Sequence, residues 1–422
     1  MTLASTPAWS ALFLLLAQVF WQVVAPAQPP QWYDTLLLQL SLPAGFEISV
    51  YAEVQVGRSL ALSANGTVFV GAYDFAGIEG AAGRSLAVHA LRDLNGDGDA
   101  LDPGENVAVT ERMACPNGVA VLGADLYVAQ MSQVLKYADV ETNIDVLKTP
   151  SVVIGTESPE GAANGLPDTR WHGWRYLVAS EASGKLYVAI GSPCNVPGDG
   201  EIVDCNDTSK HPLLGSIAEF DPHEPTPTLR PIAHGIRNTL GIDFHPTTGD
   251  MWFTDNGRDN WGGTWTDRGN GRYSLQGGAG TEDMPPGELN RLPGGAAGLA
   301  ANLDFGFPRC YGRDHPDPSP DTNGVAFNPI MSCPAYHGGD LGATVGQLAG
   351  STAVPVGSVV DLAPHSATLG LRFYSPPVTS APPPQGSQFP AKYWNRAFMA
   401  QHGSWDRTQP SGYAVASVAI TS

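Results

Sequence analysis

The chain has 422 residues and is rich in the two residue types that interrupt helices. Its 49 Gly and 36 Pro residues are about a fifth of the sequence, and each costs a helix interior roughly 1 or 3 kcal/mol relative to Ala. The formal charge is −19 at pH 7, and no stretch concentrates Lys and Arg. These features exclude a helical bundle, and they make nucleic acid and anionic membrane surfaces poor partners.

The N-terminal segment has the features of a targeting sequence. Residues 8–25 are almost wholly apolar, and Ala25-Pro26-Ala27 follows as a small-x-small cleavage motif. We predict a signal peptide over residues 1–27 and a secreted, extracellular protein, periplasmic in a Gram-negative host. The alternative is an uncleaved membrane anchor, because the apolar run is nearly long enough to span a bilayer. Without that anchor we expect no membrane contact.

An acidic loop follows further along the chain. Asp93, Asn95, Asp97 and Asp99 place oxygen side chains at alternate positions, with Gly after the third of them. Such a pattern can fold around calcium, although Glu105 comes one residue late for the EF-hand spacing. The loop is interpreted either as a structural calcium site or as a solvated acidic turn.

A unit recurs along the chain, in which an apolar stretch leads through a Gly, Asn or Asp turn into a β-rich tripeptide with an aromatic centre. The centres are Phe69, Tyr127, Tyr187 and Trp252, with Phe398 in a weaker fifth copy. The first four lie about 60 residues apart, which favours a four-stranded blade over the coil of a β-helix or a pair of β-sandwiches. The longer gap before Phe398 has room for one extra unit and an insertion. We predict an all-β protein with one β-propeller domain.

Two insertions interrupt this period. Residues 261–286 and 312–357 are rich in Gly, Pro and Asp, and are predicted to be surface loops. Loops of a propeller gather at one end of its central channel, where ligands bind.

The five cysteines form no Cys-x-x-Cys pair, so an oxidising compartment explains them better than a metal site does. We predict two disulfides across polar loops, Cys194–Cys205 and Cys310–Cys333. Cys115 is then a buried free thiol, or the partner of an intermolecular bridge.

Three turns place a histidine near an arginine at corresponding points of the repeat. They are residues 171–175, 233–238 and 402–407. A neutral imidazole can take a hydroxyl proton, and a guanidinium can bind a carboxylate. Basic turns at one channel mouth of an acidic protein predict a small anionic ligand.

Several motifs together resemble the glucose/sorbosone dehydrogenase family, which includes soluble quinoprotein glucose dehydrogenase and fungal pyranose dehydrogenases. They are His172-Gly173-Trp174-Arg175, Ser192-Pro193-Cys194-Asn195, Gly235-Ile236-Arg237-Asn238, Phe253-Thr254-Asp255-Asn256-Gly257-Arg258-Asp259, Glu288-Leu289-Asn290-Arg291, Phe305-Gly306-Phe307-Pro308 and His402-Gly403-Ser404-Trp405. The resemblance covers residues 42–422 as one domain. It implies a six-bladed propeller that binds pyrroloquinoline quinone (PQQ) and Ca²⁺, and an external electron acceptor.

The resemblance also implies roles for particular residues. His172 resembles the general base that removes the proton of the sugar hydroxyl. Arg237 would stabilise charge on the reduced cofactor, and with Asn238 it resembles the pair that contacts the quinone oxygens. Gly257 and Arg258 stand where the family offers backbone carbonyls to calcium.

The remaining candidates concern the rim of the cofactor. Arg58 and Arg407 are expected to bind its carboxylates, and His365 and Trp405 are weaker candidates for contact with it. The sequence departs from the family at Gly287, where Asp is expected.

The C-terminus also departs from the family pattern. The chain ends at Ser422, soon after Gly412, whereas family members continue for several strands. We therefore expect a last blade that is incomplete or that is closed by an N-terminal strand such as residues 46–51.

The function predicted from these features is a quinoprotein dehydrogenase that oxidises an aldose or a sorbosone-type sugar. A calcium-dependent lactonase on a similar propeller is one alternative. A binding propeller without cofactor is another.

Overall fold

The computed structural model describes residues 33–74, 85–155, 165–167, 172–193, 195, 213–261, 264–269, 272–276, 282–294, 298–300, 303–308, 310–313, 315–316, 356–375, 388–404 and 407–420. The chain divides into two compact units, residues 1–53 and 54–422. Within the described part of the first unit, the short helix α2 (Asp34–Leu37) precedes an irregular stretch.

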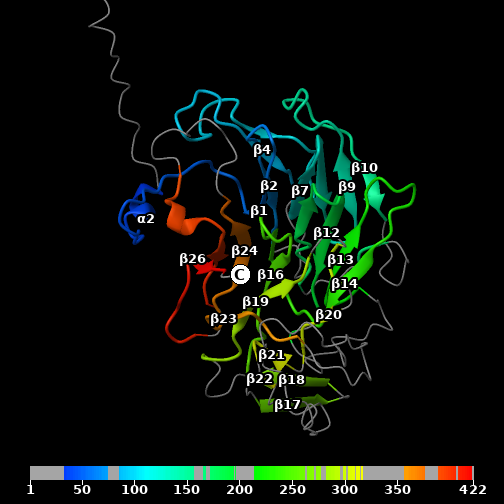
Figure 1. Ribbon diagram of the computed structural model, residues 1–422, viewed down its shortest axis with the longest axis vertical. Helices are drawn as coiled ribbons and strands as arrows, with labels where there is room; N and C mark the ends of the chain where they lie inside the picture. Colours follow the sequence, from blue (N-terminus) through cyan, green and yellow to red (C-terminus); the bar gives the residue numbers. More distant parts are fainter. Residues whose placement is uncertain are drawn as a thin grey trace, which may run out of the picture. The chain divides into compact units, whose positions relative to one another are not determined.

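The second unit is a β-propeller, and its antiparallel sheets follow one another in chain order as blades (Figure 1). Blade 1 contains β1 (Gly57–Leu62), β2 (Val68–Ala72), β4 (His89–Leu91) and β5 (Asn106–Ala108). Blade 2 contains β7 (Gly118–Leu122), β8 (Asp125–Ala129), β9 (Val134–Tyr137) and β10 (Ser151–Ile154). Blade 3 contains β11 (Leu177–Ser180), β12 (Lys185–Ile190), β13 (Ser216–Phe220) and β14 (Arg230–His234), with β20 (Leu303–Asp304) added in parallel.

Two further blades follow in the chain. Blade 4 contains β15 (Gly241–Phe244), β16 (Met251–Asp255), β19 (Gly287–Leu292) and β23 (Val360–Leu362). Blade 5 contains β24 (Thr368–Phe373), β25 (Arg396–Gln401) and β26 (Ala414–Ala419), with the 3₁₀ turn η2 (Ala391–Tyr393) between β24 and β25. Short pairs join β3 (Ser85–Leu86) to β6 (Met113–Ala114), and β21 (Cys310–Tyr311) to β22 (His315–Pro316).

The aromatic residue at the centre of each of the first four repeat copies packs between its own blade and the next. Phe69 belongs to the core between blades 1 and 2, and Tyr127 to the core between blades 2 and 3. Tyr187 lies between blades 3 and 4, and Trp252 between blades 4 and 5. All four are at most 3% exposed. A blade buries its faces only against its neighbours, so the repeat found in the sequence is the repeat of these interfaces.

The described residues form five blades. The predicted β-propeller is therefore confirmed, but the predicted number of six blades was wrong. The chain between Trp252 and Phe398 adds no further described blade, because β19 and β23 join blade 4, β20 joins blade 3, and β24 belongs to the same blade as Phe398. Phe398 packs within its own blade, with ring centroids 5.4 Å from Phe389 and 5.9 Å from Tyr393. Residues 46–51 form no strand, so the expected N-terminal strand is also absent.

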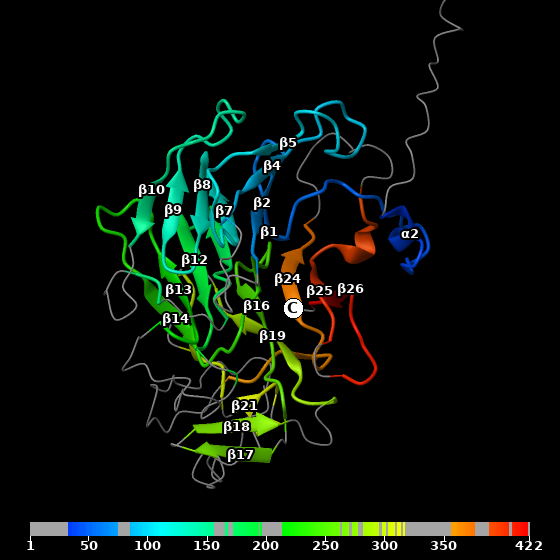
Figure 2. The same ribbon diagram turned by 180° about the vertical axis from the view of Figure 1, so that it is seen from behind.

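The described residues of the first predicted insertion include a hairpin. Within residues 261–286, β17 (Thr264–Gly269) pairs with β18 (Arg272–Gln276), and Figure 2 shows this hairpin beside β21. The surface loop expected here therefore contains regular structure. Most of the second insertion, residues 317–355, lies outside the described part.

No helix in the described ranges is long and apolar enough to cross a membrane. The predicted signal peptide, residues 1–27, and its alternative as an anchor lie outside those ranges.

Candidate active site

The candidate residues lie at one end of the sheets. In each blade the first strand starts and the second strand ends at the same end, because the two are antiparallel. Arg58 lies at the start of β1, His172 precedes β11, and Arg237 precedes β15. His365 precedes β24 and Arg407 follows β25. Residues from four blades are thus brought to one end of the propeller.

His172 is held in the orientation of a base. Its Nδ1 lies 2.8 Å from the carbonyl oxygen of Ser192, which can only accept a hydrogen bond. Nδ1 therefore donates, and Nε2 carries the lone pair. Gly191 makes room for this ring, because a Cβ at that position would lie 2.3 Å from the Cβ of His172. The backbone of His172 has a φ of 49°, a conformation rare for a residue with a side chain and common at functional sites.

Burial and the positive charge of Arg237 lower the pKa of His172 well below its usual range, although the bond to Ser192 opposes this. His172 and Arg237, from different turns, therefore act on one another electrostatically. The neutral imidazole remains available as a base in mildly acidic solution.

Arg237 and Asn238 are fixed by a buried carboxylate at the end of β16. Asp255 accepts hydrogen bonds from the backbone nitrogens of Arg237 (2.8 Å), Asn238 (2.6 Å) and Asn256 (3.1 Å). Burial raises the pKa of Asp255 to about 6 despite these bonds. Its cross-strand partner Glu288 has a pKa raised well above the usual range by burial and by the neighbouring Asp255.

Arg237 is 5% exposed, and the hydrogen bonds of its guanidinium go to two different segments, which follow β12 and β16. Nε donates to the carbonyl oxygen of Asn195 (3.2 Å), Nη2 to Oδ1 of Asn195 (2.7 Å), and Nη1 to the carbonyl oxygen of Asn256 (3.2 Å). Neither Asn195 nor Asp255 was assigned a role from the sequence. Both residues lie within motifs that resemble the family, and this could have indicated a role for them.

The predicted calcium-presenting segment is tightly packed. A Cβ on Gly257 would lie 2.8 Å from both Pro285 Cγ and Pro286 O, so only Gly fits against this turn. Arg258 is 0% exposed, and its guanidinium lies over Trp261 with 5.0 Å to the ring centroid. The segment is therefore tightly packed, and backbone carbonyl oxygens are among the ligands that calcium accepts.

The rim candidates fall into two groups. Arg58 lies over the ring of Trp174 at 5.6 Å from the centroid, and its charge lowers the pKa of His402 after the effect of burial. Nε2 of His365 lies 2.9 Å from the carbonyl oxygen of Met284, and Arg407 Nη1 donates to that of Glu282 at 2.7 Å. The structure brings His365 and Arg407 to one loop. Trp405 lies outside the described residues.

The donors at this end fit an anion with carboxylates and carbonyl oxygens. Among the described residues, Arg407 Nε is buried and has no hydrogen-bond partner, an arrangement that is costly unless a ligand completes it. Arg58, Arg237 and Arg407 supply forked donors. The residues present therefore fit PQQ as the resemblance implies.

Arg175 has a structural role, which differs from the ligand-facing role expected for arginines of the His/Arg turns. It is 1% exposed, and it donates to the backbone carbonyls of Met131 at 2.8 Å and of Pro167. Through these hydrogen bonds to carbonyl oxygens, the buried Arg175 holds the loops of neighbouring blades together.

The acidic loop is closed by its own backbone. Asp93 accepts bonds from the nitrogens of Gly96 (2.6 Å) and Gly98 (3.0 Å), and the buried Glu105 accepts from that of Leu94 (2.7 Å). Within the described ranges, no group of three or more His, Cys, Asp or Glu residues is arranged to hold a metal ion. Calcium binding at Asp93, Asn95, Asp97 and Asp99 thus remains a prediction, and the observed bonds are those of a structured acidic turn.

The cysteine predictions are tested only in part. Cys115 is free and buried, as predicted. Cys194, Cys205 and Cys333 lie outside the described residues, so the two disulfides remain predictions.

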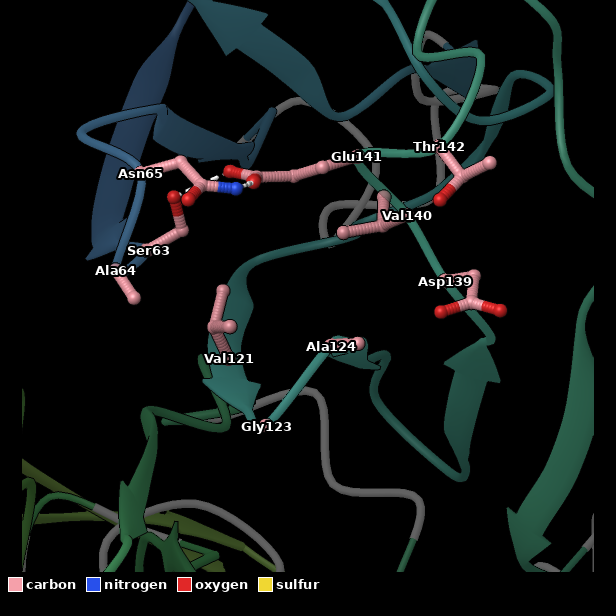
Figure 3. Close-up of a pocket in the computed structure, with 10 residues that line it drawn as sticks. All are labelled: Ser63, Ala64, Asn65, Val121, Gly123, Ala124, Asp139, Val140, Glu141 and Thr142. Atoms are coloured by element: carbon pink, nitrogen blue, oxygen red, sulfur yellow. Dashed lines mark hydrogen bonds between the residues drawn. The ribbon is translucent and has the colours of Figure 1, made fainter.

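A cavity of about 250 Å³ lies at the opposite end of the sheets, between the β1–β2 turn and the β7–β8 turn. Figure 3 shows the carboxylate of Glu141 turned toward Ser63 and Asn65, which both donate to it. The volume is below the range of roughly 300 to 1,000 Å³ typical of ligand pockets. It is separate from the candidate active site.

The family model described as TrAA12-like matches residues 42–422, so the chain belongs to this family. A Trichoderma reesei enzyme of carbohydrate-active enzyme family AA12, solved with iodide, is 20% identical, with a TM-score of 0.59 over 88% of this chain and 79% of that one.

Two further proteins are similar to the chain. The holo form of the pyranose dehydrogenase PQQ domain from Coprinopsis cinerea is 17% identical, with a TM-score of 0.55 over 86% of this chain and 75% of that one. An uncharacterized protein of Borreliella burgdorferi is 22% identical over 91% of this chain and 77% of its own length. The two solved structures share the propeller fold, and the chain is homologous to oxidoreductases.

Proposed function

We propose that the protein is a secreted quinoprotein dehydrogenase that oxidises an aldose or sorbosone-type sugar with PQQ and Ca²⁺ and passes the electrons to an external acceptor. The observation that carries this is the pair of His172, which is partly buried, and the buried Arg237, whose charge acts on the imidazole at the loop end of the blades. The similarity to a PQQ-containing pyranose dehydrogenase domain supports the choice of cofactor.

The chain's own residues would perform the proton chemistry. His172 Nε2 would take the proton of the anomeric hydroxyl, while the bond from Nδ1 to Ser192 keeps the ring in place. The hydrogen on the same carbon would leave with the electron pair of the C–H bond, as hydride to the acceptor, so that a C=O bond forms and the sugar is oxidised by two electrons. When bound, the quinone supplies the hydride acceptor and calcium polarises it.

The remaining residues would bind the cofactor. Arg237 and Asn238 would face its quinone oxygens, and the nearby positive charge of Arg237 would stabilise the anion that reduction produces. Arg58 and Arg407 would bind its carboxylates. The backbone carbonyls of Gly257 and Arg258 would contribute oxygen ligands for calcium.

The test is to incubate the protein with PQQ and Ca²⁺ and to follow bleaching of an artificial electron acceptor with a panel of aldoses. We expect bleaching that requires both additions. A folded protein that neither binds the quinone nor turns over would contradict the proposal. Hydrolysis of sugar lactones in a parallel assay with Ca²⁺ alone would instead identify the lactonase alternative.

A further inference from the structure

The outer strand of blade 5 differs from the outermost strands of the other four blades. Blade 5 contains three described strands, and β26 (Ala414–Ala419) pairs only with β25. It is six residues long, whereas the outermost strands of the other blades have two to four residues. The main chain along the outer side of β26 therefore has no hydrogen-bond partner in any described strand.

The free edge of β26 also lacks the residues that usually protect such an edge. Natural proteins protect a free strand edge with charged residues, with proline, or by keeping the strand short. The other four outermost strands contain or directly follow such a residue, namely Glu105 before β5, Pro150 before β10, Asp304 in β20 and Asp361 in β23. By contrast, residues 411–422 contain no charged residue and no proline. The edge of β26 is therefore suited to pairing with another strand.

The charge of the chain favours a second copy as the partner at this edge. The formal charge is −19, so two copies repel each other on average. This repulsion is weakest where residues 411–422 of two copies meet, because the segment is uncharged. Tyr413 is 78% exposed and Val415 is 73% exposed, so contact there also removes apolar surface from water.

The sequence of β26 is complementary to itself. A two-fold axis makes two copies of the strand antiparallel, and it passes beside one residue, because opposed side chains share a face of the sheet and alternate along the strand. With the axis at Ser417, Val415 lies opposite Ala419 of the second copy, and Ala416 lies opposite Val418 of the second copy. Each valine then faces an alanine, and no like charges meet.

We propose that β26 pairs antiparallel with β26 of a second copy, so that the sheet of blade 5 continues into its counterpart and the protein forms a two-fold symmetric dimer. Within one copy, β25 and β26 already pair in the antiparallel manner. A single strand pair buries less surface than a standard interface, so the dimer is weak. The proposal is independent of the proposed function, because none of the paired residues is a candidate active-site residue.

The experiment compares charge variants at the two opposed positions, Val415 and Ala419, which are both exposed. Sedimentation equilibrium of the wild type should show a dimer that dissociates on dilution, with a micromolar dissociation constant. Val415→Glu/Ala419→Glu should weaken the dimer at least about tenfold, because like charges lie directly opposite each other twice. Val415→Lys/Ala419→Lys should weaken it similarly. An equimolar mixture of the two double variants should recover the affinity as a heterodimer.

The matched control is Val152→Glu on the outer strand of blade 2. Val152 is an exposed valine of β10, with 52% of its surface accessible. This variant should leave the dissociation constant unchanged, because β10 belongs to another blade.

A second readout follows the backbone of β26 without any variant. Amide hydrogens alternate between the two sides of a strand, so pairing protects those on the outer side of β26. Amide exchange within residues 413–420 should slow as the wild-type concentration rises through the dissociation constant. Exchange within β10 should not depend on concentration.

Several outcomes would overturn the proposal. A monomer at every concentration would do so, and so would amides of β26 that are equally protected at high dilution, because the edge would then be covered within one chain. Double variants that dimerise like the wild type, or that do not associate when mixed, would exclude the β26 pair. If the double variants do not fold, the concentration dependence of exchange in the wild type decides.

Discussion

The junction between blades 1 and 2 and the junction between blades 3 and 4 share one backbone arrangement. At the first, the nitrogen of Ala72 donates to the carbonyl of Pro116 at 2.9 Å. At the second, the nitrogen of Ser192 donates to the carbonyl of Arg237 at 2.8 Å. In both, a glycine precedes the donor, because a side chain at Gly71 would collide with the backbone of the next turn and one at Gly191 would collide with His172.

The two junctions differ in the side chain that the accepting turn carries. Pro116 offers no hydrogen-bond donor, whereas Arg237 brings a guanidinium that Asn195 and the backbone of Asn256 hold in place. His172 is packed only against the second junction, over Gly191. The blades therefore provide equivalent positions, and the residue types at one of them supply the chemistry.

The largest effect is expected from removing the base at the second junction. His172→Ala should lower kcat by roughly 10² to 10⁴-fold while quinone binding is retained, since the ring moves a proton and its loss leaves Arg237 in place. Steady-state bleaching of the acceptor and a quinone titration measure the two quantities.

His245→Ala provides the control, because His245 is a buried histidine that lies after β15, at the other end of the blade. It should leave kcat nearly unchanged. Normal turnover in His172→Ala would place the base elsewhere.

A pair of glycine substitutions compares the junctions directly. Gly71→Ala would put a Cβ 2.1 Å from the carbonyl oxygen of Asn117, and Gly191→Ala one 2.3 Å from the Cβ of His172. Each should lower the free energy of unfolding by about 1 to 3 kcal/mol, as overpacking does, measured by urea denaturation. Only Gly191→Ala should also lower kcat, because it displaces the base. Equal losses of kcat in both variants would remove the distinction between the junctions.

A smaller effect is expected in the pH dependence of kcat/KM and of the free energy of unfolding. Burial and Arg237 lower the pKa of His172, so the acid limb of kcat/KM should lie below the ordinary histidine value of about 6.5. The unfolded chain binds a proton there that the folded chain excludes, so the free energy of unfolding should fall as pH drops below about 6.5. A pH profile of kcat/KM and urea titrations at several pH values test this. An acid limb above pH 6.5 would show that His172 is not desolvated.

The interfaces of the fold could be predicted because they repeat. Phe69, Tyr127, Tyr187 and Trp252 each fill the space between two blades, so one physical requirement recurs at a constant spacing. The number of blades could not be counted in this way, since strands such as β20 join a sheet formed much earlier in the chain.

Motifs in the sequence by themselves determined the all-β class, the propeller, and the presence of His172, Arg237 and Asn238 in turns. Only the tertiary structure decided what those turns contact. Asn195 is 42 residues from Arg237, and Asp255 is 18 residues from it. The physical reason is that a local pattern fixes where a strand ends, whereas hydrogen bonds between turns depend on how neighbouring blades pack. The same packing sends Arg175 into the interior and leaves Arg237 beside the base.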